Sequence, residues 1–290
     1  MASQPIFRFA PSPNGWLHVG HAYSALFTDR AARSLGGVML LRIEDIDVAR
    51  CKPEYDAAIM EDLRWLGLAW PEPVLRQAER FPIYQAAADE LRDRDLLYPC
   101  FCSRGEVAVL ATGADLDGAP LYPGTCRRLA AKAIHQKLAH REPVQWRLRT
   151  DAALVAAGGD LAIDEIPVAG HDLIPSRQSR RAADPRRWGD VVLVRKDIPT
   201  SYHLSVVVDD AAQGVTHVSR GMDLYPATDI HVLLQRLLGL PSPVYAHHDL
   251  IIDTAARKLG KSAGAPALRL LREAGWTPAR LREQLGFRGS

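Results

Sequence analysis

The sequence predicts an α/β protein whose parallel sheet is interrupted by an insertion, and two observations carry this expectation. Before Cys100, short apolar runs alternate with helical patterns, which is typical of a parallel sheet covered by helices. From Cys100 to about Trp188 this alternation stops and the chain becomes irregular, so we expect an inserted segment there.

The alternation before Cys100 consists of two apolar runs and three helical patterns. The runs Ile6–Ala10 and Val38–Ile43 are short and apolar, and each ends in residues typical of a turn or a strand end, so we expect strands. Apolar residues recur at helical spacing over Ala22–Leu35, Tyr55–Leu66 and Phe81–Arg94, which predicts three helices.

The rest of the chain returns to the α/β pattern after the insertion. Within the insertion we expect a polar helix near Leu129–Ala139 and a strand at Val144–Leu148. Beyond it, we expect strands at Val191–Val194, Ser205–Val208 and Leu250–Ile252, a helix at Ala227–Leu238 and two short closing helices. The predicted division is therefore 1–98 and 189–250 for the two halves of the α/β domain, 99–188 for the inserted subdomain and 251–290 for a polar loop with short helices.

Composition excludes several classes of protein. Hydrophobic residues make up 47% and charged residues 24%, as in an ordinary soluble globular protein, and the net charge of +2 neither indicates nor excludes a nucleic-acid partner. The N-terminus lacks the apolar region of a secretory signal, and no stretch reaches the roughly 20 apolar residues of a membrane helix. Four cysteines are too few for a disulfide scaffold. We therefore expect a cytoplasmic protein.

The first motif with chemical content follows the first predicted strand and reads Pro-Ser-Pro-Asn-Gly-Trp-Leu-His18-Val-Gly20-His21. The start of a helix favours bound phosphate, Gly20 allows close approach to the backbone, and imidazole N–H groups can donate to phosphate oxygens. Taken alone, a helix start with two incidental histidines explains the motif equally well.

The second motif, Arg257-Lys258-Leu-Gly-Lys261-Ser262, lies in the predicted polar loop near the end of the chain. Two lysines and a hydroxyl suit a triphosphate, although a lone motif of this kind is more often a solvated basic turn. Together, the two motifs resemble the signature sequences of class I aminoacyl-tRNA synthetases.

Further segments resemble the glutamyl/glutaminyl branch of that family. They read Arg8-Phe-Ala-Pro-Ser12-Pro-Asn-Gly, Leu-Arg-Ile-Glu44-Asp-Ile-Asp, Val-Val-Val-Asp-Asp210 and Gly-Val-Thr-His-Val-Ser-Arg220-Gly-Met-Asp. The resemblance implies a Rossmann-type catalytic domain with an inserted zinc-containing subdomain and a short helical C-terminal extension. Only 28 residues follow Ser262, so we expect the short members of the branch, which lack an anticodon-binding region.

The resemblance also implies roles for individual residues. Those expected to hold glutamate are Arg8, Ser12, Glu44, Tyr202 and Arg220. Those expected to bind ATP are His18, Gly20, His21, Lys258, Lys261 and Ser262, with His18, His21 and Lys261 also catalytic. The set suits glutamate, since a dianionic amino acid needs two cationic partners and one anionic partner. Taken singly, each charged residue has a structural ion pair as its simpler explanation, and Tyr202 a place in the core.

Three of the four cysteines cluster at Cys100, Cys102 and Cys126, which indicates a metal site more than buried free thiols. Spacing leaves the fourth ligand open between His135 and His140, whereas the resemblance implies Tyr122. We expect one structural zinc ion, which would stabilise a loop-rich insertion with little core of its own. Cys51 stands apart from the group.

The implied reaction is tRNA-independent activation of L-glutamate with ATP and Mg²⁺, followed by transfer to queuosine in the anticodon of tRNA(Asp), by an enzyme that we expect to be a monomer. The alternatives are a truncated glutamyl-tRNA synthetase that charges a tRNA 3′ end, another nucleotidylyltransferase, and a zinc-containing RNA-binding module without catalysis. Gly260, where the family usually has serine, keeps the last alternative open. For the arginine-rich segment Pro175–Trp188 we place no counterpart in the family, and we expect a mobile surface loop. The loop either contacts tRNA phosphates or varies within the family without that role.

Overall fold

The computed structural model describes residues 4–251 and 266–287. Its centre is a twisted sheet in which β1 (Ile6–Phe9) pairs in parallel with β2 (Val38–Ile43), and β2 pairs with β3 (Leu75–Arg76). On the other side of β1 lies β11, because the Thr216 amide donates to the Ile6 carbonyl at 2.9 Å. The sheet continues through β11 (His217–Gly221), β12 (Val244–His248), β6 (Ala162–Glu165) and the antiparallel edge strand β9 (Ser179–Ala182).

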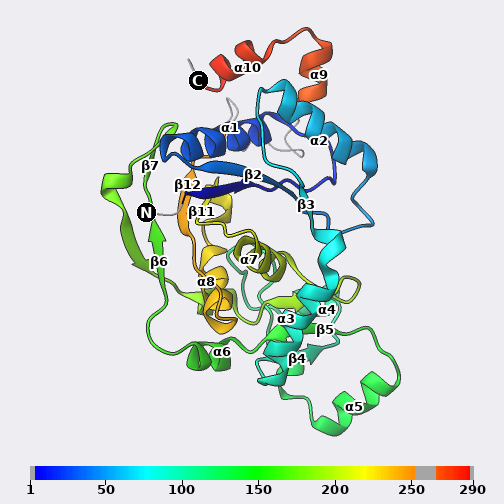
Figure 1. Ribbon diagram of the computed structural model, residues 1–290. Helices are drawn as coiled ribbons and strands as arrows, with labels where there is room; N and C mark the ends of the chain where they lie inside the picture. Colours follow the sequence, from blue (N-terminus) through cyan, green and yellow to red (C-terminus); the bar gives the residue numbers. More distant parts are fainter. Residues whose placement is uncertain (1–3, 252–265, 288–290) are drawn as a thin grey trace.

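Helices cover both faces of this sheet (Figure 1). On one face lies α1 (Val19–Ser34), which buries Leu26 and Phe27 in the same core as Phe7 and Phe9 of β1. The helix ends before Gly36, whose φ of +67° suits glycine. On the other face lie α7 (Tyr202–Ala212) and α8 (Thr228–Leu237).

A second, smaller sheet is antiparallel and has the order β10-β5-β4. Its strands are β4 (Leu97–Cys100), β5 (Gln145–Leu148) and β10 (Val192–Val194), and the helices α4 (Arg104–Leu110) and α5 (Ala131–Ala139) lie between β4 and β5 in sequence. This sheet lies at the opposite end of the molecule from α9 and α10 (Figure 1).

The remaining elements connect these layers. The helices are α2 (Pro53–Trp65), α3 (Phe81–Asp93), α6 (Thr150–Ala157), α9 (Leu268–Glu273) and α10 (Pro278–Gln284). The two-stranded hairpin is β7 (Val168–Ala169) with β8 (Asp172–Leu173). The 3-10 turns are η1 (Gln77–Arg80), η2 (Thr125–Arg128), η3 (Pro175–Arg177), η4 (Pro185–Trp188) and η5 (Met222–Leu224). No helix in these described ranges is long and apolar enough to cross a bilayer.

Two of the expected strands were wrong. The run Ser205–Val208 belongs to helix α7, in which every residue from Leu204 to Asp210 is buried. A helix buried on all sides shows no 3.6-residue periodicity, and a short apolar run then looks the same as a buried strand. The last strand is β12 (Val244–His248) rather than Leu250–Ile252; Leu250 and Ile251 follow it, and Ile252 lies outside the described residues.

The arginine-rich segment is not the loop that the sequence suggested. It contains β9, which pairs antiparallel with β6, and it ends in the buried side chain of Trp188. Arg181 lies in this strand and pairs with Glu165 at 3.0 Å and with Asp229 at 2.9 Å. The high charge density predicted a solvent-exposed loop, but Arg181 is a part-buried ion-pair partner and Arg180 lies 3.7 Å from Asp164.

The division of the chain at residue 188 stays a prediction. Strand pairing crosses that boundary in both directions: β10 joins the small sheet beside β5, whereas β6 and β9 join the large sheet beside β12.

Candidate active site and cysteine cluster

A cavity of about 630 Å³ lies at the carboxyl ends of β1, β2, β11 and β12. This edge is where open parallel sheets bind ligands. The cavity is lined by every described residue that was predicted to bind glutamate or ATP, namely Arg8, Ser12, His18, Gly20, His21, Glu44, Tyr202 and Arg220. The other three, Lys258, Lys261 and Ser262, lie outside the described residues.

At the N-terminus of α1, hydrogen bonds determine which ring nitrogens of His18 and His21 carry a proton. The Gly20 amide donates to Nδ1 of His18 at 3.1 Å, and the His18 amide donates to Nδ1 of His21 at 3.1 Å. A backbone N–H can only donate, so each Nδ1 is an acceptor, and the neutral ring carries its proton on Nε2. Both rings line the cavity, and their centroids are 3.8 Å apart. The helix start therefore presents imidazole N–H donors beside its own positive dipole end.

The two described flanks of residues 252–265 both lie at this end of the sheet. Leu250 and Ile251 line the cavity. Beyond the segment, Leu268 donates its amide to the Leu17 carbonyl at 2.8 Å, directly before the histidine motif.

A buried network of charges supports one side of the cavity. Asp210 accepts from Nε of Arg8 at 3.0 Å and from Arg42 at 2.8 Å, and Arg42 also donates to Glu44 at 3.1 Å. All four side chains are at least largely buried, and Arg42 is completely so. Because Asp210 uses the Nε side of Arg8, the arginine is held in place while it lines the cavity.

The pKa values of the two carboxyl groups in this network shift in opposite directions. Burial would raise the pKa of Asp210, but Arg8 and Arg42 outweigh it and bring that pKa below its ordinary value. Burial raises the pKa of Glu44 above its ordinary value, and the opposing effect of Arg42 and Arg8 is smaller. Asp210 is thus a stabilising anion, whereas the negative charge of Glu44 lacks a full set of partners.

On the other side of the cavity, Arg220 is buried among uncharged acceptors. It donates through NH2 to Thr228 Oγ1 at 2.6 Å, through NH1 to His231 Nδ1 at 3.2 Å, and through Nε to His247 Nε2 at 3.3 Å. The Tyr202 hydroxyl lies 3.5 Å from NH1. Among the residues that the structure describes, no carboxylate forms an ion pair with Arg220, although the side chain is only 4% exposed.

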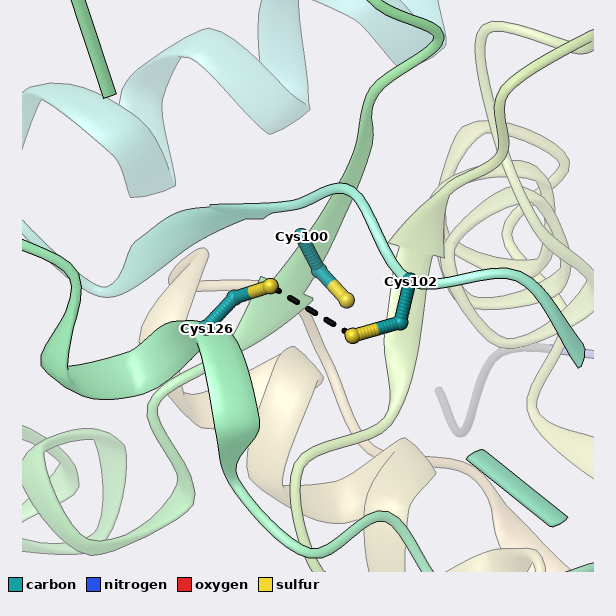
Figure 2. A group of neighbouring side chains, drawn as sticks. All are labelled: Cys100, Cys102 and Cys126. Carbon is teal, nitrogen blue, oxygen red and sulfur yellow. Dashed lines mark hydrogen bonds between the residues drawn. The ribbon is translucent and has the colours of Figure 1, made fainter. Parts of the chain in front are cut away.

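The cysteine cluster lies beside the small sheet, where β4 meets α4 and η2. The ligand atoms of Cys100, Cys102 and Cys126 all lie within 4.8 Å of one another, and Figure 2 shows the three sulfurs converging. The Tyr122 hydroxyl lies 3.4 Å from Cys100 Sγ and accepts from the Cys126 amide at 2.7 Å. This donor set fits a tetrahedral thiolate-binding metal, with Tyr122 beside it.

The alternative ligands His135 and His140 are exposed on and after α5, and neither belongs to the group of potential metal ligands in the described residues. Cys51 lies apart, with its sulfur 3.9 Å from the Ser12 hydroxyl.

Several site residues carried no role in the sequence reasoning. Asp210 stands in a segment that resembles the family, but nothing in its neighbours indicates that it binds Arg8. No sequence motif pointed to Thr228, His231 or His247. The one local hint is that His247 and His248 are adjacent at the end of β12. The remaining unassigned side chains around the cavity include Tyr23, Ser24, Ser219, Asp223, His248 and Asp249.

Comparison with known proteins gives consistent results. A family model described as tRNA synthetases class I (E and Q), catalytic domain, matches residues 6–290. The chain is 48% identical to a glutamyl-Q tRNA(Asp) synthetase of Rhodobacter capsulatus over 97% of this chain and the whole of that protein. It is 38% identical to a glutamate–tRNA ligase of Aquifex aeolicus over 94% of this chain but 55% of that protein.

A solved structure has the same fold. It is a crystal structure of a glutamate tRNA ligase from Elizabethkingia meningosepticum in complex with its amino acid, with a TM-score of 0.73 and 25% identity over 98% of this chain and 60% of that one. With the cavity geometry and the family match in agreement, this chain belongs to the class I tRNA synthetases (E and Q) and carries their catalytic domain.

Proposed function

We propose that this protein activates L-glutamate with ATP to form glutamyl-adenylate without tRNA, and then transfers the glutamyl group to queuosine in the anticodon of tRNA(Asp). The observation that carries the choice of glutamate is the buried Arg220, which no described carboxylate neutralises. A buried charge without a partner is costly, so its retention indicates an anionic ligand.

The ion pairs beside the cavity also favour an anionic ligand at Arg220. Arg8 and Arg42 pair with Asp210 and Glu44, whereas Arg220 forms no ion pair with a described carboxylate. In this arrangement Arg220 binds the side-chain carboxylate, Glu44 the α-ammonium group and Arg8 the α-carboxylate, with Ser12 and Tyr202 completing the pocket.

Activation requires an in-line attack by the α-carboxylate of glutamate on the α-phosphorus of ATP. The bond from that phosphorus to the bridging oxygen of the β-phosphate breaks, and pyrophosphate leaves. The Nε2–H groups of His18 and His21 donate to phosphate oxygens, and Lys258, Lys261 and Ser262 contribute further donors. Magnesium, when bound with ATP, would neutralise part of the phosphate charge. Catalysis by these residues is mainly orientation and charge stabilisation.

In the second step, a hydroxyl of the RNA attacks the carbonyl carbon of the adenylate, and AMP leaves. The relative from Rhodobacter capsulatus, which this chain covers in full, supports queuosine of tRNA(Asp) as the acceptor through its name. The glutamate–tRNA ligase of Aquifex aeolicus supports the second candidate, transfer to a tRNA 3′ end, but this chain covers only 55% of that protein.

We also propose that Cys100, Cys102, Cys126 and Tyr122 hold one zinc ion with a structural role. When bound, zinc would join β4, the start of α4 and η2, which otherwise share a core of only a few buried side chains. The ion would supply folding free energy rather than chemistry, since none of these four residues lines the cavity that contains Arg220.

The decisive test is amino-acid-dependent ATP–pyrophosphate exchange, run with each amino acid and without tRNA. We expect exchange with glutamate alone; exchange that begins only when tRNA is added would contradict tRNA-independent activation. Transfer is then measured with tRNA(Asp) that contains or lacks queuosine, each with an intact or periodate-oxidised 3′ end. Queuosine dependence with resistance to periodate supports the proposal, and the opposite pattern supports charging of the 3′ end.

A further inference from the structure

The hydrogen bonds around Arg220 determine the proton positions of the histidines that contact it. A guanidinium group only donates, so Nδ1 of His231 and Nε2 of His247 must both be unprotonated acceptors. His231 then carries its proton on Nε2, which lies 3.3 Å from Nδ1 of His203. Burial, and then the charge of Arg220, lowers the pKa of His231 well below its ordinary value and that of His247 to about 2. The histidine shell is therefore uncharged.

Two carboxylates near this shell are each engaged by another arginine. Glu165 lies 4.0 Å from Nδ1 of His247, but it binds Arg181 at 3.0 Å. Asp229 follows Thr228 directly in sequence, and it binds Arg181 at 2.9 Å. Tyr245, whose ring lies 5.3 Å from the Arg220 guanidinium carbon, is uncharged as well. On the cavity side, Asp210 and Glu44 bind Arg42, and the other two acidic lining residues, Asp223 and Asp249, form no ion pair with Arg220.

The geometry leaves part of Arg220 available to a ligand. His231, His247 and Thr228 use three of its five N–H groups, which leaves one on each terminal nitrogen. The one on NH1 meets only the Tyr202 hydroxyl, at 3.5 Å. Two N–H groups on the terminal nitrogens form the fork that binds a carboxylate with two parallel hydrogen bonds.

We propose that His231 and His247 are specificity-determining residues, because they fix the plane of Arg220 while leaving its charge for the side chain of the substrate. A carboxylate at either position would hold the guanidinium equally well but would neutralise it, and the site would then lose its preference for an anionic over a neutral amino acid. This inference rests on the proposed activation of glutamate.

The test uses pairs of variants that differ only in charge. Asn places its Oδ1 where His231 places Nδ1, so His231→Asn keeps a neutral acceptor. His231→Asp has a side chain of the same shape as Asn but carries a negative charge. His247→Gln and His247→Glu form the equivalent pair for Nε2. Tight binding of Arg220 by an introduced carboxylate should lower kcat/KM for glutamate by about tenfold to a hundredfold relative to the neutral partner, mainly through KM. The rate with glutamine should fall much less.

The assay is pyrophosphate exchange with glutamate and with glutamine, and circular dichroism checks that each variant is folded. A ratio of glutamate to glutamine kcat/KM that collapses in the Asp or Glu variant but not in its Asn or Gln partner supports the inference. Equal ratios within a folded pair overturn it, because a purely structural role would not distinguish charge. If one pair fails to fold, the other decides. No glutamate-dependent exchange by the unsubstituted protein would overturn the proposed function itself, and this inference with it.

Discussion

Replacement of Asp210 by asparagine should lower the stability of the protein, because Asp210 is the shared partner of two buried arginines. Asn keeps the shape of Asp but removes the charge that Arg8 and Arg42 share at 3.0 and 2.8 Å. Removal of one partner from a buried ion pair costs about 3–5 kcal/mol, because the other charge stays buried without compensation. Two arginines depend on Asp210, so we expect the loss in free energy of unfolding to fall within that range at pH 7.

The pH dependence of this loss follows from the lowered pKa of Asp210. A carboxyl group with a depressed folded-state pKa contributes stability above its unfolded pKa of about 3.9, and that stability is lost as pH falls through the folded-state value. The difference between the unsubstituted protein and Asp210→Asn should therefore be constant from pH 7 to about pH 5 and shrink at lower pH.

Glu44→Gln provides the control within the same network. The pKa of Glu44 is raised, so its ionised form reduces stability as pH rises through that value, and its neutralisation should cost less stability than Asp210→Asn. Urea denaturation followed by circular dichroism measures both variants. If Asp210→Asn unfolds within about 1 kcal/mol of the unsubstituted protein, or Glu44→Gln loses more stability than Asp210→Asn, our account of the network is wrong.

Three further predictions concern chemistry, metal and RNA. Lys261→Ala should lower glutamate-dependent exchange about a hundred- to thousand-fold with unchanged circular dichroism, because it removes a donor to the phosphates; a normal rate would contradict its role. Metal analysis should find one zinc per chain, and Cys126→Ser should lose both metal and stability, whereas a metal-free protein that is fully stable and active would refute the zinc site. The four exposed arginines of the arginine-rich segment are Arg177, Arg180, Arg186 and Arg187. Their replacement by alanine should weaken tRNA binding, reduce the log–log slope of its salt dependence by about 0.7 to 0.9 per lost phosphate contact, and leave glutamate activation unchanged. An unchanged slope would show that the segment does not contact RNA.

Arg181 is left out of that RNA test for a structural reason. It pairs with Glu165 and Asp229 beside the shell of Arg220, so its loss would free two carboxylates near the amino-acid pocket. The sequence grouped it with the other arginines because charge density along the chain does not show which face of an edge strand each residue occupies.

The sequence by itself determined the fold class, the histidine motif at the start of α1 and the cysteine cluster. These features are local: a strand that runs into a helix, or two cysteines two positions apart, are specified by neighbours in the chain. The same local reasoning failed for Ser205–Val208, where burial on all sides removes the periodicity that distinguishes a helix from a strand.

Only the tertiary structure decided which charges compensate one another. Arg8 and Asp210 lie 202 positions apart, and Arg42 and Asp210 lie 168 apart, so no spacing rule could pair them. His231 and His247 approach Arg220 from α8 and β12, and they are neutral because burial penalises their charged forms. Burial and distance set both the strength of an ion pair and the pKa of a histidine, and both arise only when the sheet and helices pack.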